Sequence, residues 1–234
     1  MPGSDLAGIH YLRDVDDAAA LRTELRAAGN VVVVGGGFVG LEAAAAATAA
    51  GKHVTVVEAA ERLLPRAVAP EMSEFYAAAH RRRGTKVLLD TAVAGFGGDG
   101  RVDSVELCDG HVLPADVVVV GIGLVPHTEL AESLGLECVG GIVVDELAHT
   151  SVPSIVAAGD CTVTAHPEHG ALRLESVQNA IAQAKVAAAT LLDVEPPSTG
   201  VPWFWFDQAD LRLQMAGINT GYDQVVLRGE PASE

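Results

Sequence analysis

Positive charge is scarce in this chain of 234 residues. Lysine and arginine together number 15, against 31 aspartates and glutamates, so the formal net charge is −16 at pH 7. A surface this acidic repels phosphate backbones and anionic lipid headgroups. The basic run Arg81–Arg83 is more typical of the solvated end of a helix than of a docking patch. The composition therefore predicts a protein that binds neither nucleic acid nor membranes.

Cysteine is also rare. Cys108, Cys138 and Cys161 stand far apart, and no CxxC or CxxxxC pair occurs, so a redox-active dithiol is not expected. This usage fits a reducing, intracellular compartment. The opening residues MPGSDLAG have neither the basic nor the apolar region of a secretory signal, and no apolar stretch approaches a membrane span. We therefore expect a cytoplasmic protein.

What the chain does contain is a strand, a glycine turn, a helix and a second strand between Asn30 and Glu58. Val31–Val34 form a β-branched apolar run, as expected of a strand buried on both faces of a parallel sheet. The letters GGGFVG follow, then an alanine-rich helix expected at Leu41–Ala50, then a strand at Val54–Val57. This order predicts a βαβ unit that binds a dinucleotide.

Each glycine of the turn has a physical reason. Gly35 allows the sharp exit from the strand, and Gly37 lets a pyrophosphate approach the backbone. Gly40 lets the helix lie close to the strand, while the helix N-terminus supplies amides and a positive dipole end to the phosphates. The alternative is a glycine-rich turn with no ligand, which the agreement of strand, helix and second strand disfavours.

Glu58 stands at the carboxyl end of the second strand. A carboxylate there can accept hydrogen bonds from both ribose hydroxyls, and it repels a 2′-phosphate. The sequence therefore favours NAD(H) over NADP(H), although Arg62 and Arg66 follow closely enough to soften that preference.

Further elements follow from periodicity and turn residues. Helices are expected over 14–28, 70–83 and 176–192, and strands over 86–89, 93–96, 101–107, 111–113, 115–123 and 154–160. Turns at 97–100 and 109–110 indicate hairpins, a polar loop follows residue 160, and 196–200 resembles a linker. Residues 203–227 alternate like strands but are too few for an independent core.

Taken together, these segments resemble one family, the FAD-dependent NADH:ferredoxin reductases of the rubredoxin and putidaredoxin type. The segments that carry the resemblance are HYLRDVDDAAALR, VVVVGGGFVGLEAAAAA, LPADVVVVGIGLVPHTELA, GIVVDELAHTS, IVAAGDC, RLESVQNAIAQAK, PWFWFDQADLRLQMAG and GYDQVVLRG. The PWFW-x-DQ segment discriminates best, because the wider class of flavoproteins with two dinucleotide-binding domains shares the others.

The resemblance implies an α/β, Rossmann-like flavoprotein with two dinucleotide-binding domains, similar to glutathione reductase but truncated. The family opens with an FAD-binding βαβ unit that does not precede these segments here, and it continues beyond RGEPASE. The domains implied are 1–25, the end of the first FAD segment; 26–124, the NADH-binding domain; 125–196, the second FAD segment; and 197–234, the start of a C-terminal interface domain.

The resemblance also implies two sets of cofactor-binding residues. The NADH set is Gly35, Gly36, Gly37, Phe38, Val39, Gly40, Glu42, Glu58, Gly121, Ile122 and Gly123. The FAD set is Arg13, Asp160, Val177 and Trp203. Without the family, Asp160 would cap a turn, Glu42 would be an acid favoured by the helix dipole, and Trp203 would be a core or interface anchor.

For the complete enzyme the implied reaction passes a hydride from NADH to FAD and single electrons to a ferredoxin or rubredoxin. The cofactors perform this chemistry, so no catalytic acid or nucleophile is required, and only Glu42 and Trp203 are weak candidates near the nicotinamide and flavin. The alternatives are a flavin-free NAD(H)-binding module without activity, or a reductase related to monodehydroascorbate or nitrite reductases. The segment HPEH at 166–169 suggests two metal ligands, but its proline and the lack of a third ligand favour a loop.

Overall fold

The computed structural model describes residues 1–166 and 169–229, which form two compact units. Unit 1 comprises residues 1–123, 207–212 and 226–229. Unit 2 comprises the described residues of 124–206 together with 213–225.

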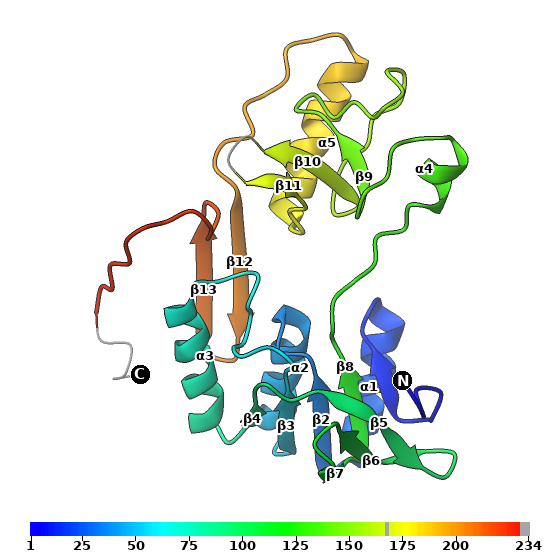
Figure 1. The fold of residues 1–234 in the computed structure, drawn as a ribbon, viewed down its shortest axis with the longest axis vertical. Coiled ribbons are helices and arrows are strands. Elements are labelled where there is room, and N and C mark those ends of the chain that lie inside the picture. Colours follow the sequence, from blue (N-terminus) through cyan, green and yellow to red (C-terminus); the bar gives the residue numbers. More distant parts are fainter. Residues whose placement is uncertain (167–168, 230–234) are drawn as a thin grey trace. The chain divides into compact units, whose positions relative to one another are not determined.

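A five-stranded parallel sheet forms the centre of unit 1 (Figure 1). Its strands, in spatial order, are β1 (Ile9–Tyr11), β8 (Val117–Val120), β2 (Asn30–Val34), β3 (His53–Val57) and β4 (Lys86–Leu88). All four neighbouring pairs run parallel, so the predicted α/β architecture with a parallel sheet is confirmed. The carboxyl ends of β2, β3 and β8 therefore meet at one edge, where ligands bind in such sheets.

Both faces of this sheet are covered, which explains the unbroken valine run. Val32 and Val34 pack into a core with Val105, from the antiparallel sheet of β5 (Val93–Gly98), β6 (Val102–Leu107) and β7 (Val112–Pro114). On the other face lies α2, whose Gly40 approaches the side chain of Val33. The hairpins predicted on either side of residues 97–100 and 109–110 are present.

The helices of unit 1 are α1 (Val15–Leu25), α2 (Phe38–Ala49) and α3 (Pro70–Arg82). Asp14 and Asp17 form a reciprocal capping box at the start of α1. The prediction that α2 begins at Leu41 was wrong by three residues. Gly37, in extended conformation, is already the N-cap, so Phe38 opens the helix and Gly40 lies inside it.

Unit 2 contains α4 (Glu129–Ser133), β9 (Ile142–Val144), β10 (Thr162–His166), β11 (Gly170–Leu172) and α5 (Val177–Leu191). The three strands form a sheet in the order β11–β10–β9. The expected helix over 176–192 is confirmed, with Ser176 as its N-cap and Leu192 as its C-cap. The expected polar loop is instead the hairpin of β10 and β11.

The strand expected at residues 154–160 was also wrong. The segment forms a single bridge, between His149 and Val156, made by the backbone hydrogen bonds that Ala157 donates to Ala148 and Thr150 donates to Ile155. An apolar run becomes a strand only where a neighbouring strand offers a continuous ladder of donors and acceptors, and here the pairing stops after these bonds.

A second hairpin, formed by β12 (Trp203–Gln208) and β13 (Leu211–Ala216), contributes its tip, Asp207–Arg212, to unit 1. The alternating pattern predicted strand character as far as Leu227, but residues 217–229 contain no strand.

Candidate functional site

The glycine turn after β2 is fixed by steric contacts on three sides. A methyl group added at Gly35 would overlap the carbonyl oxygen of Gly121, and one added at Gly40 would overlap that of Gly35. Gly35 also has φ +105°, a conformation that favours glycine. A methyl group at Gly37, in contrast, would meet nothing nearer than 3.9 Å. The turn is therefore tightly packed except at Gly37, where its surface is open.

The Glu58 carboxylate and the loop that follows it hold the Gly36 peptide of this turn. The Gly36 N–H donates to Oε2 of Glu58 at 2.6 Å, and the Ala60 N–H donates to Oε1 at 2.8 Å. From the following loop, the Leu64 N–H donates to the carbonyl oxygen of Gly36 at 2.9 Å. Each Glu58 oxygen keeps a second lone-pair direction for a hydroxyl donor, because a carboxylate offers about four acceptor sites.

The sequence placed Glu58 after the second strand but did not indicate this contact with Gly36. The signal available was the acidic residue at the end of a strand that neighbours the glycine turn. That the two meet depends on the register of β2 and β3, which pairs Val34 with Val57.

Arg62 is already engaged elsewhere. Its guanidinium donates to the carbonyl oxygens of Val68 and Pro65 and to Oγ of Ser73, and so holds the loop between β3 and α3. The expectation that Arg62 softens the preference against a 2′-phosphate is therefore not supported. Arg66 is exposed, and its guanidinium lies 3.5 Å from the position a methyl group would take on Gly123.

The third predicted segment, Gly121–Gly123, lies beside the glycine turn, because β8 and β2 are neighbours and end together. Gly123 has φ +114°, and the side chain of Ile122 is 66% exposed. The structure thus brings the two glycine segments and Glu58 to one edge of the sheet.

The first turn of α2 carries Phe38, Val39 and Glu42. Val39 and Glu42 are exposed, yet desolvation by surrounding atoms raises the pKa of Glu42, and the nearby Asp207 carboxylate raises it further. Asp207 belongs to the hairpin tip that joins unit 1. Burial and the same carboxylate raise the pKa of Tyr76 to about 12. Sequence reasoning did not associate Asp207 or Tyr76 with this helix.

In unit 2, Asp160 and Val177 line one depression of about 520 Å³ together with Ala180, Ile181 and Ala184. Gln183 of α5 holds the turn that presents Asp160: its Oε1 accepts from the Gly159 N–H at 2.7 Å and from the Thr162 hydroxyl at 2.9 Å. Sequence reasoning missed Gln183, although it stands within the quoted segment RLESVQNAIAQAK.

The remaining predicted residues are exposed. Arg13 lies in unit 1, where its backbone N–H donates to Asp17. Trp203 lies in unit 2 at the start of β12 with 42% of its surface exposed. Arg13 and Asp160 thus belong to different units.

No metal centre emerges from the part of the chain that the structure describes. The rings of His166 and His169 lie 4.6 Å apart, while residues 167 and 168 between them are outside the described residues. No group of three or more histidine, cysteine or acidic side chains suited to a metal ion occurs among the described residues. All three cysteines are free thiols.

Within residues 1–166 and 169–229, none of the helices has the length and apolar character needed to cross a membrane.

Comparison with known proteins places these features in a family. The family model for pyridine nucleotide-disulphide oxidoreductases matches residues 1–184, and the model of a reductase C-terminal domain matches residues 203–234. The chain is 44% identical to a ferredoxin–NAD(P)(+) reductase of Sphingomonas sp, a match that covers 99% of this chain and 57% of that protein. It is 45% identical to rhodocoxin reductase of Rhodococcus erythropolis, covering 98% and 54%.

A solved structure, the covalent complex of putidaredoxin reductase with putidaredoxin, superposes with a TM-score of 0.93 at 42% identity, covering 98% of this chain and 56% of that one. The chain thus spans about half the length of the relatives it matches. The predicted resemblance and the Rossmann-like flavoprotein fold are confirmed. This chain belongs to the pyridine nucleotide-disulphide oxidoreductase family.

Proposed function

We propose that the edge of the unit 1 sheet binds NADH, and that the chain is part of a reductase that passes electrons from NADH through FAD to a ferredoxin or rubredoxin. One observation carries the nucleotide site. The glycine turn is packed everywhere except at Gly37, and its Gly36 peptide is held by Glu58 on the adjacent strand. A turn with no ligand would not require an open backbone at the helix N-terminus.

The residues present fit NADH. The open face of Gly37 and the N-terminal amides of α2 would hold the pyrophosphate, and the unused lone pairs of Glu58 would accept the ribose hydroxyls. Gly121, Ile122 and Gly123 would lie along the nicotinamide half, where the exposed Ile122 shields a ring from water. Phe38, Val39, Gly40 and Glu42, in the first turn of α2, complete this set.

The residues of unit 2 fit one part of an FAD site. Asp160 has an exposed carboxylate suited to ribitol hydroxyls, and the Ser176-capped N-terminus of α5 offers a positive dipole end near Val177. In the proposed whole protein, Arg13 and Trp203 contribute to the same flavin. When bound, FAD supplies two-electron exchange with NADH and one-electron exchange with an iron–sulfur protein.

Relatives named for ferredoxin, rhodocoxin and putidaredoxin support the proposed iron–sulfur partner. The division into an NADH-binding domain at 26–124 flanked by FAD segments is part of the same proposal, and the end of the first stretch of unit 1 at Gly123 supports its C-terminal limit. A cytoplasmic location belongs to the same proposal, because the reaction draws on the NADH of that compartment.

The second candidate is a nucleotide-binding module that holds no flavin. It is favoured by the nucleotide-site features that lie within unit 1 alone, at one edge of a single sheet. The visible spectrum of the purified chain separates the two: flavin absorption supports the reductase, and a colourless protein that still binds NADH supports the module. Reduction of cytochrome c with and without added ferredoxin separates a ferredoxin reductase from a monodehydroascorbate- or nitrite-reductase-like enzyme.

The nucleotide site is tested by Gly37→Val. Because the Cβ of the new side chain would meet nothing nearer than 3.9 Å, we expect little change in the melting temperature but NADH affinity at least about 10-fold weaker, as the pyrophosphate loses its close approach. Calorimetric titration with NADH measures the affinity. Gly51→Ala, just beyond the C-terminal end of α2 and also facing open space, is the control for binding: its φ of +75° costs some stability, but it retains NADH affinity. Unchanged NADH affinity in Gly37→Val would overturn the site.

The role of Glu58 is tested by comparing NADH with NADPH. We expect Glu58→Ala to weaken NADH more than NADPH, because only the 2′-hydroxyl donates to the carboxylate. Since the carboxylate also accepts from Gly36 and Ala60, the variant loosens the turn for both nucleotides, so the ratio of the two affinities is the informative quantity. Glu61→Ala, a neighbouring exposed acid, serves as the control. Equal losses for the two nucleotides would contradict the ribose role.

A further inference from the structure

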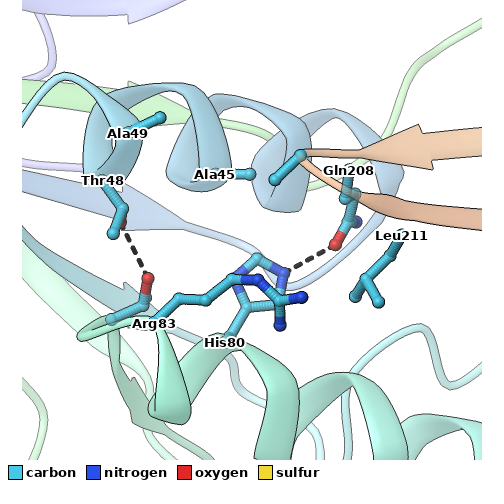
Figure 2. A pocket seen from close by; sticks show the side chains of 9 residues that line it. Ala45, Thr48, Ala49, His80, Arg83, Gln208 and Leu211 are labelled. Atoms are coloured by element: carbon cyan, nitrogen blue, oxygen red, sulfur yellow. Dashed lines mark hydrogen bonds between the residues drawn. The ribbon is translucent and has the colours of Figure 1, made fainter. Parts of the chain in front are cut away.

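A cavity of about 220 Å³ lies in unit 1 on the side of α2 away from the glycine turn. The residues that line it come from α2, from α3 and the short segment just after α3, and from the tip of the β12–β13 hairpin. They are Ala45, Thr48, Ala49, His80, Arg83, Thr85, Gln208, Ala209 and Leu211. Figure 2 shows the side chains of His80 and Gln208 meeting at its edge.

His80 and Gln208 form the contact between α3 and the hairpin tip. They are 4% and 2% exposed, and Nε2 of His80 lies 2.6 Å from Oε1 of Gln208. Because an amide oxygen only accepts, the ring must donate from Nε2. A second contact lies at the surface, where the Arg83 guanidinium donates to Oδ1 of Asp210 at 2.6 and 3.0 Å.

The buried contact is only half satisfied. The Nε2 amide group of Gln208 has no hydrogen-bond partner among the described residues and is shielded from solvent. A buried donor left unpaired opposes burial, so Gln208 is a poor choice for stability alone. A leucine of similar volume would remove this unpaired donor, but it would leave the buried Nε2–H of His80 without an acceptor. Gln208 is better explained by its one hydrogen bond, to His80, because that bond orients the hairpin tip on α3.

The surroundings of His80 make this bond sensitive to pH. Burial lowers the pKa of His80, and the nearby Arg83 guanidinium lowers it further, while the bond to Gln208 acts in the opposite direction. The cavity residues contributed by α2 are uncharged. Of the two acids on the tip, Asp210 is paired with Arg83, and the Asp207 carboxylate acts on Glu42 and Tyr76. A positive charge on the His80 ring would therefore meet little compensating negative charge while the tip is seated.

We propose that Gln208 and His80 are positioning residues: their hydrogen bond seats the hairpin tip on α3 while the imidazole is neutral, and so fixes the end of the strand that carries Trp203 and Trp205. Neither residue touches a cofactor in this proposal. The seating of the hairpin tip does not depend on the proposed function. Only the relevance of this seating to electron transfer rests on it, because that function places Trp203 beside the flavin.

The sign of the pH dependence follows from linkage. The seated tip lowers the pKa of His80, so the unseated state binds more protons in acid. Seating is complete well above the ordinary histidine pKa of about 6.5 and is lost progressively as the pH falls below it.

Intrinsic fluorescence of the full chain, without added flavin, tests the proposal. The two tryptophans of the chain both lie on β12, so their emission reports on that strand alone. We expect a reversible red shift as the pH falls from 8 to 5. His80→Gln keeps a side-chain donor for Gln208 but cannot titrate, so its emission should stay constant over that range. Gln208→Glu supplies a carboxylate that pairs with the imidazolium, and should keep the unshifted emission at pH 5.

An identical red shift in wild type and His80→Gln would overturn the proposal, as would an absent shift in wild type. If the variants do not fold, hydrogen exchange of the wild-type chain gives the answer. Corrected for intrinsic rates, amides of Asp207–Arg212 should lose protection at least about tenfold between pH 8 and 5, while β2 and β8 stay protected. Equal protection of these amides at pH 8 and pH 5 would contradict the proposed seating of the tip. NADH binding at pH 8 is a separate measurement, so its failure would affect the proposed function alone.

Discussion

Both units present a glycine-bearing turn and a helix N-terminus, but they support these features differently. In unit 1 the turn between β2 and α2 follows a strand that is paired on both sides, with the valine-rich strands β3 and β8. The Gly36 peptide of the turn is held by hydrogen bonds to Glu58, at the end of β3, and from Leu64 in the following loop. In unit 2 the turn at Gly159–Asp160 belongs to a segment with a single bridge, and it is held chiefly by Gln183.

The side chains of unit 1 also form a larger buried core than those of unit 2. Val118 and Val105 of unit 1 are fully buried in one continuous core that joins two sheets. In unit 2, α5 buries Val186 and Ala187 in a small cluster but leaves Val177 and Ile181 more than half exposed. The comparison teaches that a nucleotide site can be complete within a few strands, whereas the exposed apolar residues beside Asp160 require a further surface or a ligand to cover them.

The largest effect is expected at the junction of the unit 1 turn with its helix. In Gly40→Ala the new methyl group overlaps the Gly35 carbonyl oxygen, so α2 must move away from β2. We expect a loss of about 3 kcal/mol in the free energy of unfolding of unit 1, together with loss of NADH binding. Denaturant unfolding followed by circular dichroism measures the loss in the free energy of unfolding.

The matched substitution in unit 2 is Gly159→Ala. Its φ of +94° is unfavourable for alanine, but the methyl group would meet only Ala180 at an ordinary 3.7 Å. A smaller loss of about 1 kcal/mol is therefore expected. A cost equal to that of Gly40→Ala would break the comparison.

The next effect concerns the single support of the unit 2 turn. Gln183→Leu removes the acceptor of the half-buried Gly159 N–H, which we expect to destabilise the turn by about 1.5 kcal/mol and to weaken flavin binding. Hydrogen exchange should show faster exchange around residues 159–162 and no change in β2 and β8. Gln178→Leu on the same helix is the control. Equal changes in both units would show that the units unfold together.

The smallest effect is electrostatic. Because the pKa of Glu42 is raised in the folded protein, the folded state binds the proton more tightly, and the charged form opposes folding as the pH rises above 4.5. Glu42→Gln should therefore stabilise unit 1 at pH 7 by only about 0.3 kcal/mol, since the side chain is exposed to solvent. Unfolding midpoints at pH 7 and pH 4 measure this difference. A gain that persists at pH 4 would assign it to packing instead.

Prediction from sequence succeeded where the signal was local. The unbroken valines of β2 and β8 indicated buried parallel strands, and the helix expected over 176–192 is present with Ser176 as its N-cap. It failed where the outcome depended on a distant partner. Residues 154–160 have the composition of a strand, but the ladder that they require is not offered beyond one bridge.

The candidate site divides in the same way. Glu58 and the glycines were predicted by position along the chain, whereas the hydrogen bond from Gly36 to Glu58 needs the register of two strands. Gln183, Asp207 and Gln208 lie in segments that carried the resemblance, but the sequence did not indicate which groups their side chains contact. Residues 128 positions apart, as His80 and Gln208 are, meet only through the tertiary fold.

The sequence by itself determined the secondary structure of the nucleotide site and the chemistry available there, because a glycine turn, a buried strand and a terminal acid are properties of neighbouring residues. The tertiary structure alone decided which groups remain open to a ligand. Arg62 is committed to its own loop and Gly37 is left bare, since hydrogen bonds and steric contacts between distant segments allocate each donor and each surface.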